Sequence, residues 1–181
     1  MRIIAGTARG RRLRSPASGE TRPATDRVRE AVFSSLGSLV EGADVADLYA
    51  GTGSFGLEAL SRGARSALFV ENGHRALEAL KANIAATGLG GKVMRARVGD
   101  FLNRCSHSFD LVFMDPPWDQ PTKTMEEEMA KLDPHLRPGA MVVVSRRHSD
   151  PVPRPPETWR VAAEKRYGDT RIIRYHKAGD T

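Results

Sequence analysis

The architecture of this chain can be predicted from one segment, Val45-Ala46-Asp47-Leu48-Tyr49-Ala50-Gly51-Thr52-Gly53-Ser54-Phe55-Gly56. Residues 45–49 are mostly apolar and predict a buried strand, and the spacing Gly51-x-Gly53-x-x-Gly56 predicts a tight turn into a helix that ends near residue 62. Glu71 lies twenty residues beyond Gly51, at the tip of the next predicted strand. This arrangement is typical of folds that bind an adenosine-containing cofactor, whose ribose hydroxyls donate hydrogen bonds to the acidic residue.

Predicted strands alternate with predicted helices along most of the chain. The strands are expected at residues 45–49, 66–71, 92–98, 109–114, 140–145, 158–165 and 170–176. Besides the helix after the glycine turn, helices are expected at residues 25–40, 74–87 and 122–133, with Gly42 ending the first and Gly88 the second. The alternation predicts a single α/β domain over residues 25–181 with a largely parallel sheet. Residues 1–24 are interrupted by glycines and prolines, and we expect them to form a separate extended or hairpin-like arm.

The segment Asp115-Pro116-Pro117-Trp118 follows the predicted strand 109–114, at the strand end where open parallel sheets bind their ligands. Asp115 offers carboxylate oxygens that accept hydrogen bonds from an exocyclic NH2 group. Pro116 and Pro117 stiffen the turn and present carbonyl acceptors. Trp118 provides a flat apolar face on which a base can stack. Together these residues predict a site for a planar aromatic amine; the alternative is a proline-rich turn in which Trp118 only packs.

Four acidic residues fall at or near the carboxyl ends of four successive predicted strands: Asp47, Glu71, Asp100 and Asp115. A carboxylate at Asp47 opposes a pyrophosphate but attracts, directly or through water, the ammonium group of a methionyl moiety. Asp100 can accept a hydrogen bond from an adenine amino group, and Phe101 can cover the ring. Taken singly, Asp47 and Asp100 have an alternative interpretation as capping or turn carboxylates. The ordered placement of all four favours a binding site.

Positive charge is concentrated near the N-terminus. The chain has a net charge of +6, and residues 1–30 contain eight arginines against three acidic residues. Because arginine makes bidentate contacts with phosphates and guanine edges, this cluster predicts a nucleic-acid-binding surface; a solvated basic face is the alternative. We expect the first four of the following residues to contact phosphates and the last three to line the entrance to the site: Arg9, Arg11, Arg12, Arg14, Arg22, Arg27 and Arg29.

Composition excludes several other classes of protein. The 181 residues suffice for one domain with a sizeable core. No apolar run approaches the roughly 20 residues of a membrane span, and the N-terminus lacks the apolar core of a signal peptide. The chain has a single cysteine, Cys105, which is typical of a protein in a reducing cytoplasm, and we assign it no role. The spacing of this cysteine and the five histidines does not resemble a zinc site. We therefore expect a cytoplasmic protein with no membrane partner and no metal.

The glycine segment, the ordered acids and the Asp-Pro-Pro-Trp turn resemble the class I S-adenosylmethionine-dependent methyltransferases that methylate amino groups. The resemblance implies a Rossmann-like fold with a mostly parallel seven-stranded sheet, helices on both faces and a short basic N-terminal arm. It also implies S-adenosylmethionine as the cofactor. The catalytic residues would be Asp115, Pro116, Pro117 and Trp118. The cofactor-binding residues would be Asp47, Tyr49, Ala50, Gly51, Thr52, Gly53, Glu71, Asp100 and Phe101.

Nearly the whole chain, including segments outside this core, is similar to the RsmD family, bacterial 16S ribosomal RNA guanine-N2 methyltransferases. The similarity lies in residues 2–13, in Thr21-Arg22-Pro23-Ala24-Thr25-Asp26-Arg27-Val28-Arg29-Glu30-Ala31-Val32-Phe33 and in residues 47–64, and becomes faint after about residue 146. Ala24 replaces the usual threonine, and Trp118 replaces the usual tyrosine or phenylalanine, which keeps a stacking face but removes any phenolic hydroxyl. The resemblance implies methylation of a guanine N2 amine in 16S ribosomal RNA or the assembled small subunit, and we expect a monomer.

Three other functions stay open at this point. A DNA adenine or cytosine N-methyltransferase shares the Asp-Pro-Pro-aromatic chemistry, but no segment is large enough for a separate target-recognition domain. A nicotinamide-dependent oxidoreductase is supported by the glycine spacing alone, and a noncatalytic RNA-binding module is disfavoured by the intact Asp115 and Glu71. The motif serves guanine N2 and adenine N6 alike, so the choice of guanine rests on the resemblance.

Overall fold

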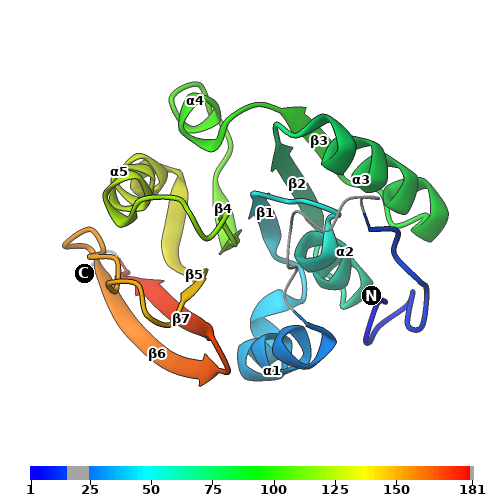
Figure 1. The fold of residues 1–181 in the computed structure, drawn as a ribbon, viewed down its shortest axis with the longest axis horizontal. Helices are drawn as coiled ribbons and strands as arrows, with labels where there is room; N and C mark the ends of the chain where they lie inside the picture. Colours follow the sequence, from blue (N-terminus) through cyan, green and yellow to red (C-terminus); the bar gives the residue numbers. More distant parts are fainter. Residues whose placement is uncertain (16–24, 180–181) are drawn as a thin grey trace.

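The structure, a computed structural model, describes residues 1–15 and 25–179. Its centre is a seven-stranded sheet in the order β3-β2-β1-β4-β5-β7-β6, in which β7 runs in the opposite direction to the other six strands (Figure 1). The strands are β1 (Asp44–Leu48), β2 (Ser66–Glu71), β3 (Lys92–Arg95), β4 (Phe109–Met114), β5 (Leu136–Arg147), β6 (Trp159–Tyr167) and β7 (Thr170–Lys177). The helices are α1 (Asp26–Leu36), α2 (Ser54–Ser61), α3 (His74–Thr87), α4 (Val98–Leu102) and α5 (Thr122–Leu132), with short 3-10 helices at Gly37–Val40 and Asp133–His135. The predicted α/β fold with a mostly parallel sheet is confirmed.

The sheet is covered on both faces because its strands alternate between two hydrophobic clusters. In β4, Leu111 and Phe113 point to the layer of α1, α2 and α3, whereas Val112 and Met114 point to the layer of α4 and α5. Figure 1 shows these two helical layers on opposite sides of the strands. Strands buried on both faces are the usual consequence of parallel pairing, so the carboxyl edge of the sheet is the part left free for a site.

Three predicted boundaries differ from the structure by three or more residues. The first helix ends at Leu36 and not near residue 40, because Gly37 adopts a φ of 54° and its N–H bonds to the Phe33 carbonyl. The third strand ends at Arg95, so Asp100 lies in α4 and not at a strand end. The fifth strand begins at Leu136 and not at residue 140, since it continues through a bulge that accommodates Pro138 and Gly139.

Residues 1–15 fold back on themselves and pack against α2. The N–H of Ile3 bonds to the Arg11 carbonyl at 2.9 Å, and the N–H of Thr7 bonds to the Ser61 carbonyl at 2.8 Å. The side chains of Ile3, Ala8 and Leu13 are buried in the core. This segment is therefore part of the hydrophobic core. Because residues 16–24 lie outside the described residues, the division into an arm and a domain at residue 24 stays a prediction.

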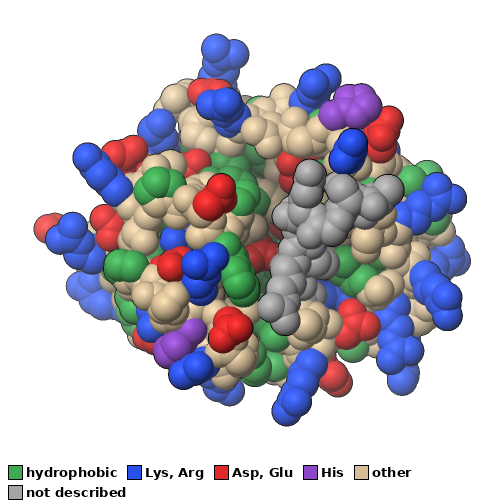
Figure 2. All heavy atoms as spheres, viewed as in Figure 1, with side chains coloured by type: hydrophobic (Ala, Val, Ile, Leu, Met, Phe, Trp, Pro, Cys, Tyr) green, Lys and Arg blue, Asp and Glu red, His purple; other side chains and the backbone are tan. Residues whose placement is uncertain are grey.

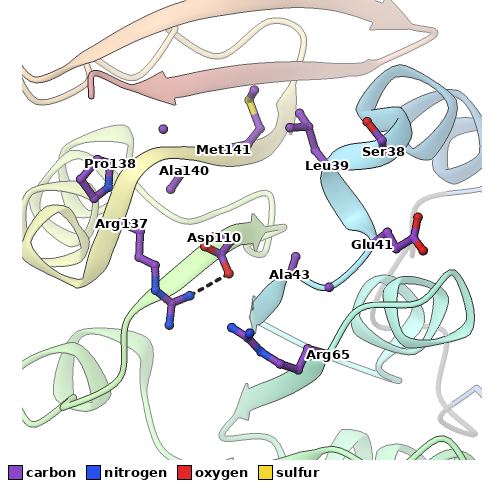
Figure 3. Close-up of a pocket in the computed structure, with 12 residues that line it drawn as sticks. Ser38, Leu39, Glu41, Ala43, Arg65, Asp110, Arg137, Pro138, Ala140 and Met141 are labelled. Carbon is purple, nitrogen blue, oxygen red and sulfur yellow. Dashed lines mark hydrogen bonds and ion pairs between the residues drawn. The ribbon is translucent and has the colours of Figure 1, made fainter. Parts of the chain in front are cut away.

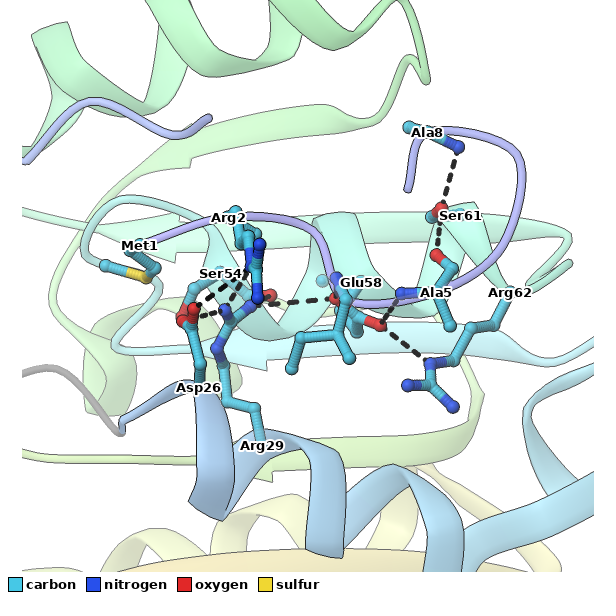
Figure 4. Close-up of polar contacts among 12 residues, drawn as sticks. Met1, Arg2, Ala5, Ala8, Asp26, Arg29, Ser54, Glu58, Ser61 and Arg62 are labelled. Carbon is cyan, nitrogen blue, oxygen red and sulfur yellow. Dashed lines mark hydrogen bonds and ion pairs between the residues drawn. The ribbon is translucent and has the colours of Figure 1, made fainter. Parts of the chain in front are cut away.

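A buried charge cluster joins this N-terminal segment to α1 and α2 (Figure 4). The fully buried Glu58 carboxylate accepts hydrogen bonds from the N–H groups of Ile4 at 2.7 Å and Ala5 at 3.0 Å. The equally buried Arg29 guanidinium lies 3.7 Å from Glu58 and donates to the carbonyls of Arg2 and Ser54. Since Ser54 opens α2 directly after the glycine turn, the cluster fixes the N-terminal segment to the loop expected to bind the cofactor.

Candidate active site

The loop between β1 and α2 and the first turn of α2 contain three glycines. Two of them lie against neighbouring side chains, and the third faces open space. A Cβ atom on Gly53 would lie 2.5 Å from Leu80, and one on Gly56 would lie 2.3 Å from the Phe69 ring. Glycine at position 56 therefore lets α2 approach β2, and glycine at position 53, whose φ is 82°, lets the loop approach α3. A Cβ atom on Gly51 would meet no atom closer than 4.0 Å, and the φ of Gly51 is 56°. The backbone at Gly51 is thus accessible, as a cofactor-binding loop requires.

Glu71 holds the glycine loop from the end of β2. Its carboxylate accepts hydrogen bonds from the N–H groups of Gly51 at 2.8 Å, Asn72 at 2.8 Å and Gly73 at 2.7 Å. A carboxylate has about four acceptor positions, so three are used in this conformation. Glu71 is well placed beside Gly51, and its contact with a ribose stays a prediction.

Asp47 lies beneath the same loop. It is 1% exposed, and its carboxylate accepts a hydrogen bond from the Gly56 N–H at 2.8 Å. Burial raises the pKa of Asp47 well above its usual value, and the negative charges of Asp115 and Glu71 add to that rise. The structure thus gives Asp47 the alternative role of a carboxylate that fixes a turn, and its contact with a cofactor ammonium stays a prediction.

Tyr49, at the end of β1, links the glycine loop to the Asp-Pro-Pro-Trp turn. Its φ of 66° is the only positive value of a non-glycine residue in the described ranges. The Tyr49 hydroxyl donates a hydrogen bond to Glu128 on α5 and accepts one from the side-chain amide of Gln120 at 2.8 Å. Gln120 also donates to Glu128 at 3.0 Å. Burial raises the pKa values of both Tyr49 and Glu128, and the raised value of Tyr49 keeps its hydroxyl protonated as the donor to Glu128.

The remaining cofactor-binding candidates lie around the same edge of the sheet. Ala50 donates its N–H to the Val70 carbonyl at 3.0 Å, and Thr52 is buried within the loop. Asp100 is exposed in the first turn of α4. The Phe101 ring is buried in the core, so it offers no open face in this conformation. Binding of a cofactor by these residues stays a prediction.

Asp115 opens onto a cavity of about 460 Å³ at the carboxyl edge of the sheet. Burial raises the pKa of Asp115 to about 6, although a hydrogen bond from the Ser145 side chain opposes the rise. The cavity is lined by the start of α1, the ends of β4 and β5 and the turn between β6 and β7: Thr25, Arg27, Val28, Asp115, Trp118, Ser145, Arg166, Tyr167, Gly168, Asp169 and Thr170. Neither Ser145 nor the β6–β7 turn was predicted to belong to the site, because no local pattern connects them with Asp115.

Trp118 is half-buried beside this cavity. The guanidinium carbon of Arg147 lies 4.9 Å from the centroid of the Trp118 ring, in a cation–π contact. A base that stacks on this face of Trp118 must displace Arg147 or move it aside. Pro116 is buried and Pro117 exposed in the turn between Asp115 and Trp118.

The predicted arginine surface is only partly available to a ligand. Arg9, Arg12, Arg14 and Arg27 are exposed and form no ion pair with the described residues, and Arg11 donates to the Ala86 carbonyl at 2.6 Å. The prediction for Arg29 was wrong, because its side chain is fully buried and paired with Asp26 and Glu58. Arg22 lies outside the described residues. Figure 2 shows one face of the molecule, which is hollowed near its middle and has basic side chains around its rim.

A second cavity, of about 510 Å³, lies at the opposite edge of the sheet (Figure 3). It contains none of the predicted site residues. Arg137 pairs there with Asp110 at 2.7 Å and with Asp44 at 2.9 Å, and Arg65 also pairs with Asp44. These charges neutralise one another, so the cavity presents no unpaired charge from this cluster.

Residues 1–15 and 25–179 contain neither a membrane-spanning helix nor a cluster of metal ligands. No helix in those ranges has the length and apolar character needed to cross a membrane. No three His, Cys, Asp or Glu residues there are grouped so that they could hold a metal ion. Cys105 is a half-buried free thiol whose pKa is raised by burial, and the structure suggests no role for it.

The strand order and the glycine loop after β1 define the fold of a class I methyltransferase. A family model described as Conserved hypothetical protein 95 matches residues 1–176. Ribosomal RNA small subunit methyltransferase D of Escherichia coli (strain K12) is 33% identical over 180 residues, which cover 98% of this chain and 90% of that protein. The chain belongs to this family, the RsmD family.

Solved structures agree with this assignment. The Escherichia coli protein yhhF has a TM-score of 0.89 and 32% identity, and the match covers 99% of both chains. A hypothetical protein of Thermus thermophilus has a TM-score of 0.83 and 30% identity, with 96% of this chain and 98% of that chain covered. The similarity to these structures extends over β5, β6 and β7, beyond the region in which the sequence resemblance was evident.

Proposed function

We propose that the protein transfers a methyl group from S-adenosylmethionine to the N2 amine of a guanine in 16S ribosomal RNA. Membership of the RsmD family and the name of the Escherichia coli relative support a methyltransferase that acts on ribosomal RNA. The observation that carries the choice of an amine is Asp115, a carboxylate with a raised pKa at the mouth of a cavity that also contains Trp118. The family assignment argues against a nicotinamide-dependent oxidoreductase, and it favours RNA over DNA as the substrate.

The residues at the carboxyl edge fit the expected cofactor. The open backbone at Gly51 and the Glu71 carboxylate beside it suit an adenosine moiety, and Asp100 is exposed nearby on α4. When bound, S-adenosylmethionine supplies a methyl group already activated by a positively charged sulfur. The protein therefore needs chiefly to position the amine in line with the methyl group and to exclude other acceptors of that group.

Asp115 and the Pro116 carbonyl are suited to hold the two N–H groups of the amine. The N2 lone pair of guanine is delocalised into the ring, which makes the amine a poor nucleophile. Hydrogen bonds from its N–H groups to a carboxylate and a carbonyl orient the nitrogen and stabilise the positive charge that develops on it. When the new C–N bond has formed, the nitrogen releases a proton to Asp115, which then passes it to water. A pKa of about 6 leaves Asp115 largely ionised at neutral pH and still able to accept that proton.

The target guanine must leave its base pair to reach Asp115, because the amine of a paired guanine is engaged. Trp118 then offers a stacking face worth about 1–3 kcal/mol for the extruded base. The exposed arginines 9, 12, 14 and 27 are suited to hold the surrounding phosphates.

The test is to incubate the protein and labelled S-adenosylmethionine with small ribosomal subunits that lack the modification, with naked 16S RNA and with duplex DNA. Chromatography of the digested product identifies the methylated nucleoside. We expect N2-methylguanosine from a ribosomal substrate, and the comparison of subunits with naked RNA identifies the form that is recognised. A methylated base from DNA, or N6-methyladenosine from RNA, would refute the proposed function.

A further inference from the structure

The turn between β6 and β7 forms the wall of the active-site cavity that faces Asp115 across the sheet edge. Asp115 follows β4, and Arg166 lies near the end of β6; both line the same cavity. In the sheet β4 and β6 are separated by β5 and β7. Three strand spacings of about 4.8 Å place β4 and β6 roughly 14 Å apart. Asp115 therefore lines the cavity from the β4 side and Arg166 from the β6 side, and Asp169 of the β6–β7 turn lines it as well.

This wall is held in place by contacts with the end of β5. The His148 N–H bonds to the Asp169 carbonyl at 2.6 Å, and Arg171 donates to the Asp150 carbonyl at 3.0 Å. Arg147, whose guanidinium covers Trp118, is paired with Thr170 in the β5–β7 ladder. The turn and the stacking residue are thus parts of one hydrogen-bonded unit.

Arg166 retains free hydrogen-bonding capacity in this unit. Its Nε donates to the Gly168 carbonyl at 2.8 Å, which fixes the guanidinium plane near the turn. The side chain is exposed and forms no ion pair with the described residues. Its two terminal NH2 groups are consequently available as a fork, the geometry with which arginine binds the O6 and N7 atoms of guanine.

The positions of polar atoms on purines make this arrangement selective. On guanine, the N2 amine lies at the opposite end of the six-membered ring from the O6/N7 edge. On adenine, the N6 amine lies next to N7, and the opposite end carries only N3 beside the sugar. A cavity with an amine acceptor on one side and a two-pronged donor on the other therefore fits guanine presented through N2 and does not fit adenine presented through N6.

We propose that Arg166 binds the O6/N7 edge of the target guanine while Asp115 binds its N2 amine, so that the β6–β7 turn determines base specificity. This inference rests on the proposed function, since it assumes that the amine at Asp115 is the reacting group. Arg166 is a specificity residue and takes no part in the transfer of the methyl group or the proton.

The experiment measures binding of nucleotides by the full-length protein saturated with S-adenosylhomocysteine. The probe is 2-aminopurine riboside 5′-monophosphate, a fluorescent base that keeps the 2-amine and N7 but lacks O6. Guanosine 5′-monophosphate is the competitor, and fluorescence reports displacement of the probe. The proteins are wild type, Arg166→Ala, Arg166→Lys and, as a matched control, Lys165→Ala, which removes an exposed positive charge from the neighbouring position of β6 outside the cavity lining.

Wild type should prefer guanosine monophosphate by about 10-fold or more, since a bidentate contact contributes about 1–3 kcal/mol of discrimination. Arg166→Ala should reduce that preference to about twofold or less, Arg166→Lys should give an intermediate value, and Lys165→Ala should behave as wild type. Retention of the preference by Arg166→Ala, its absence in wild type, or a lack of probe binding would each overturn the proposal.

The nucleoside formed by wild type separates this proposal from the proposed function. If wild type forms N2-methylguanosine and Arg166→Ala keeps its preference for guanosine, only the role of Arg166 is refuted. If wild type forms N6-methyladenosine, the proposed function is refuted, and the role of Arg166 falls with it.

Discussion

Gln120 donates its side-chain amide to the hydroxyl of Tyr49 at 2.8 Å, which connects the end of the Asp-Pro-Pro-Trp turn to the end of β1. The Gln120 carbonyl also accepts a hydrogen bond from the buried Arg146 at 2.9 Å. Gln120 therefore holds the end of the turn in two ways. Its side chain contacts Tyr49 on the cofactor side of the site, and its backbone carbonyl contacts Arg146 on β5. The two halves of the site, which are about 70 residues apart in sequence, form one rigid edge.

Substitution Gln120→Ala should lower kcat about 10-fold or more, because Asp115 and Trp118 lose a support that fixes their geometry. The affinity for S-adenosylhomocysteine should change much less, since the glycine loop keeps its bonds to Glu71 and Asp47. Steady-state kinetics with isothermal titration of S-adenosylhomocysteine measures both quantities. The neighbouring exposed residue Asp119, changed to alanine, is the control. Equal kcat values for the two variants would show that Gln120 does not position the turn.

Activity should rise with pH through about 6, because Asp115 accepts the amine N–H groups only when it is ionised. The raised pKa also means that the contribution of this carboxyl to stability is fully present below about pH 4 and is lost as pH rises through about 6. Asp115→Asn should therefore be at least as stable as wild type at pH 7 while showing a low, pH-independent activity. The kcat profile between pH 5 and 8, with thermal unfolding at pH 7, tests this, and an unchanged profile in the variant would contradict it.

Removal of Arg29 should destabilise the fold and have no specific effect on RNA binding. Arg29→Ala leaves the buried Glu58 carboxylate without one of its two arginine partners, and breaking a buried ion pair typically costs about 3–5 kcal/mol. Urea unfolding measures the loss of stability. Arg27→Ala removes an exposed arginine from the same helix and should change stability by no more than about 0.5 kcal/mol. Equal stabilities of the two variants would contradict the structural role of Arg29.

The exposed arginines of the N-terminal segment should govern the salt dependence of RNA binding. Replacing Arg9, Arg12 and Arg14 by alanine should reduce the slope of log K against log salt by about two to three, if each contacts one phosphate. Deletion of the segment is a poor test, because Ile3, Ala8 and Leu13 belong to the core. Arg104→Ala, an exposed arginine after α4, serves as control. An unchanged slope in the triple variant would show that these arginines do not contact RNA.

Local patterns predicted the elements that depend on local interactions. The bounds of β2, α3 and β4 were predicted to the residue, because β2 and β4 are short apolar runs and α3 is an amphipathic segment that ends at Gly88. The sequence pattern predicts a strand up to residue 98, where α4 begins, because the five residues of α4 carry too little periodicity to indicate a helix. Sequence also placed the glycine loop and Asp115 at one edge, which the parallel topology requires.

Tertiary packing determined what sequence could not predict. Arg29 was grouped with exposed arginines because a run of charge does not reveal which face of a helix is buried. Gln120, Glu128 and Ser145 meet the site through contacts between distant elements, and none belongs to a recognisable motif. Arg166 lies in the C-terminal region where the family resemblance is faint, so only the position of the β6–β7 turn brings it to the cavity.

The central claim is that Asp115 directs methylation to the N2 amine of guanine in 16S ribosomal RNA. The most direct measurement is a single-turnover assay of wild type and Asp115→Asn on small subunits that lack the modification, with the product nucleoside identified by mass spectrometry. We predict N2-methylguanosine from wild type and a rate at least about 100-fold lower for Asp115→Asn, with unchanged affinity for S-adenosylhomocysteine. Methylation at any other position, or equal rates for the two proteins, would contradict the claim.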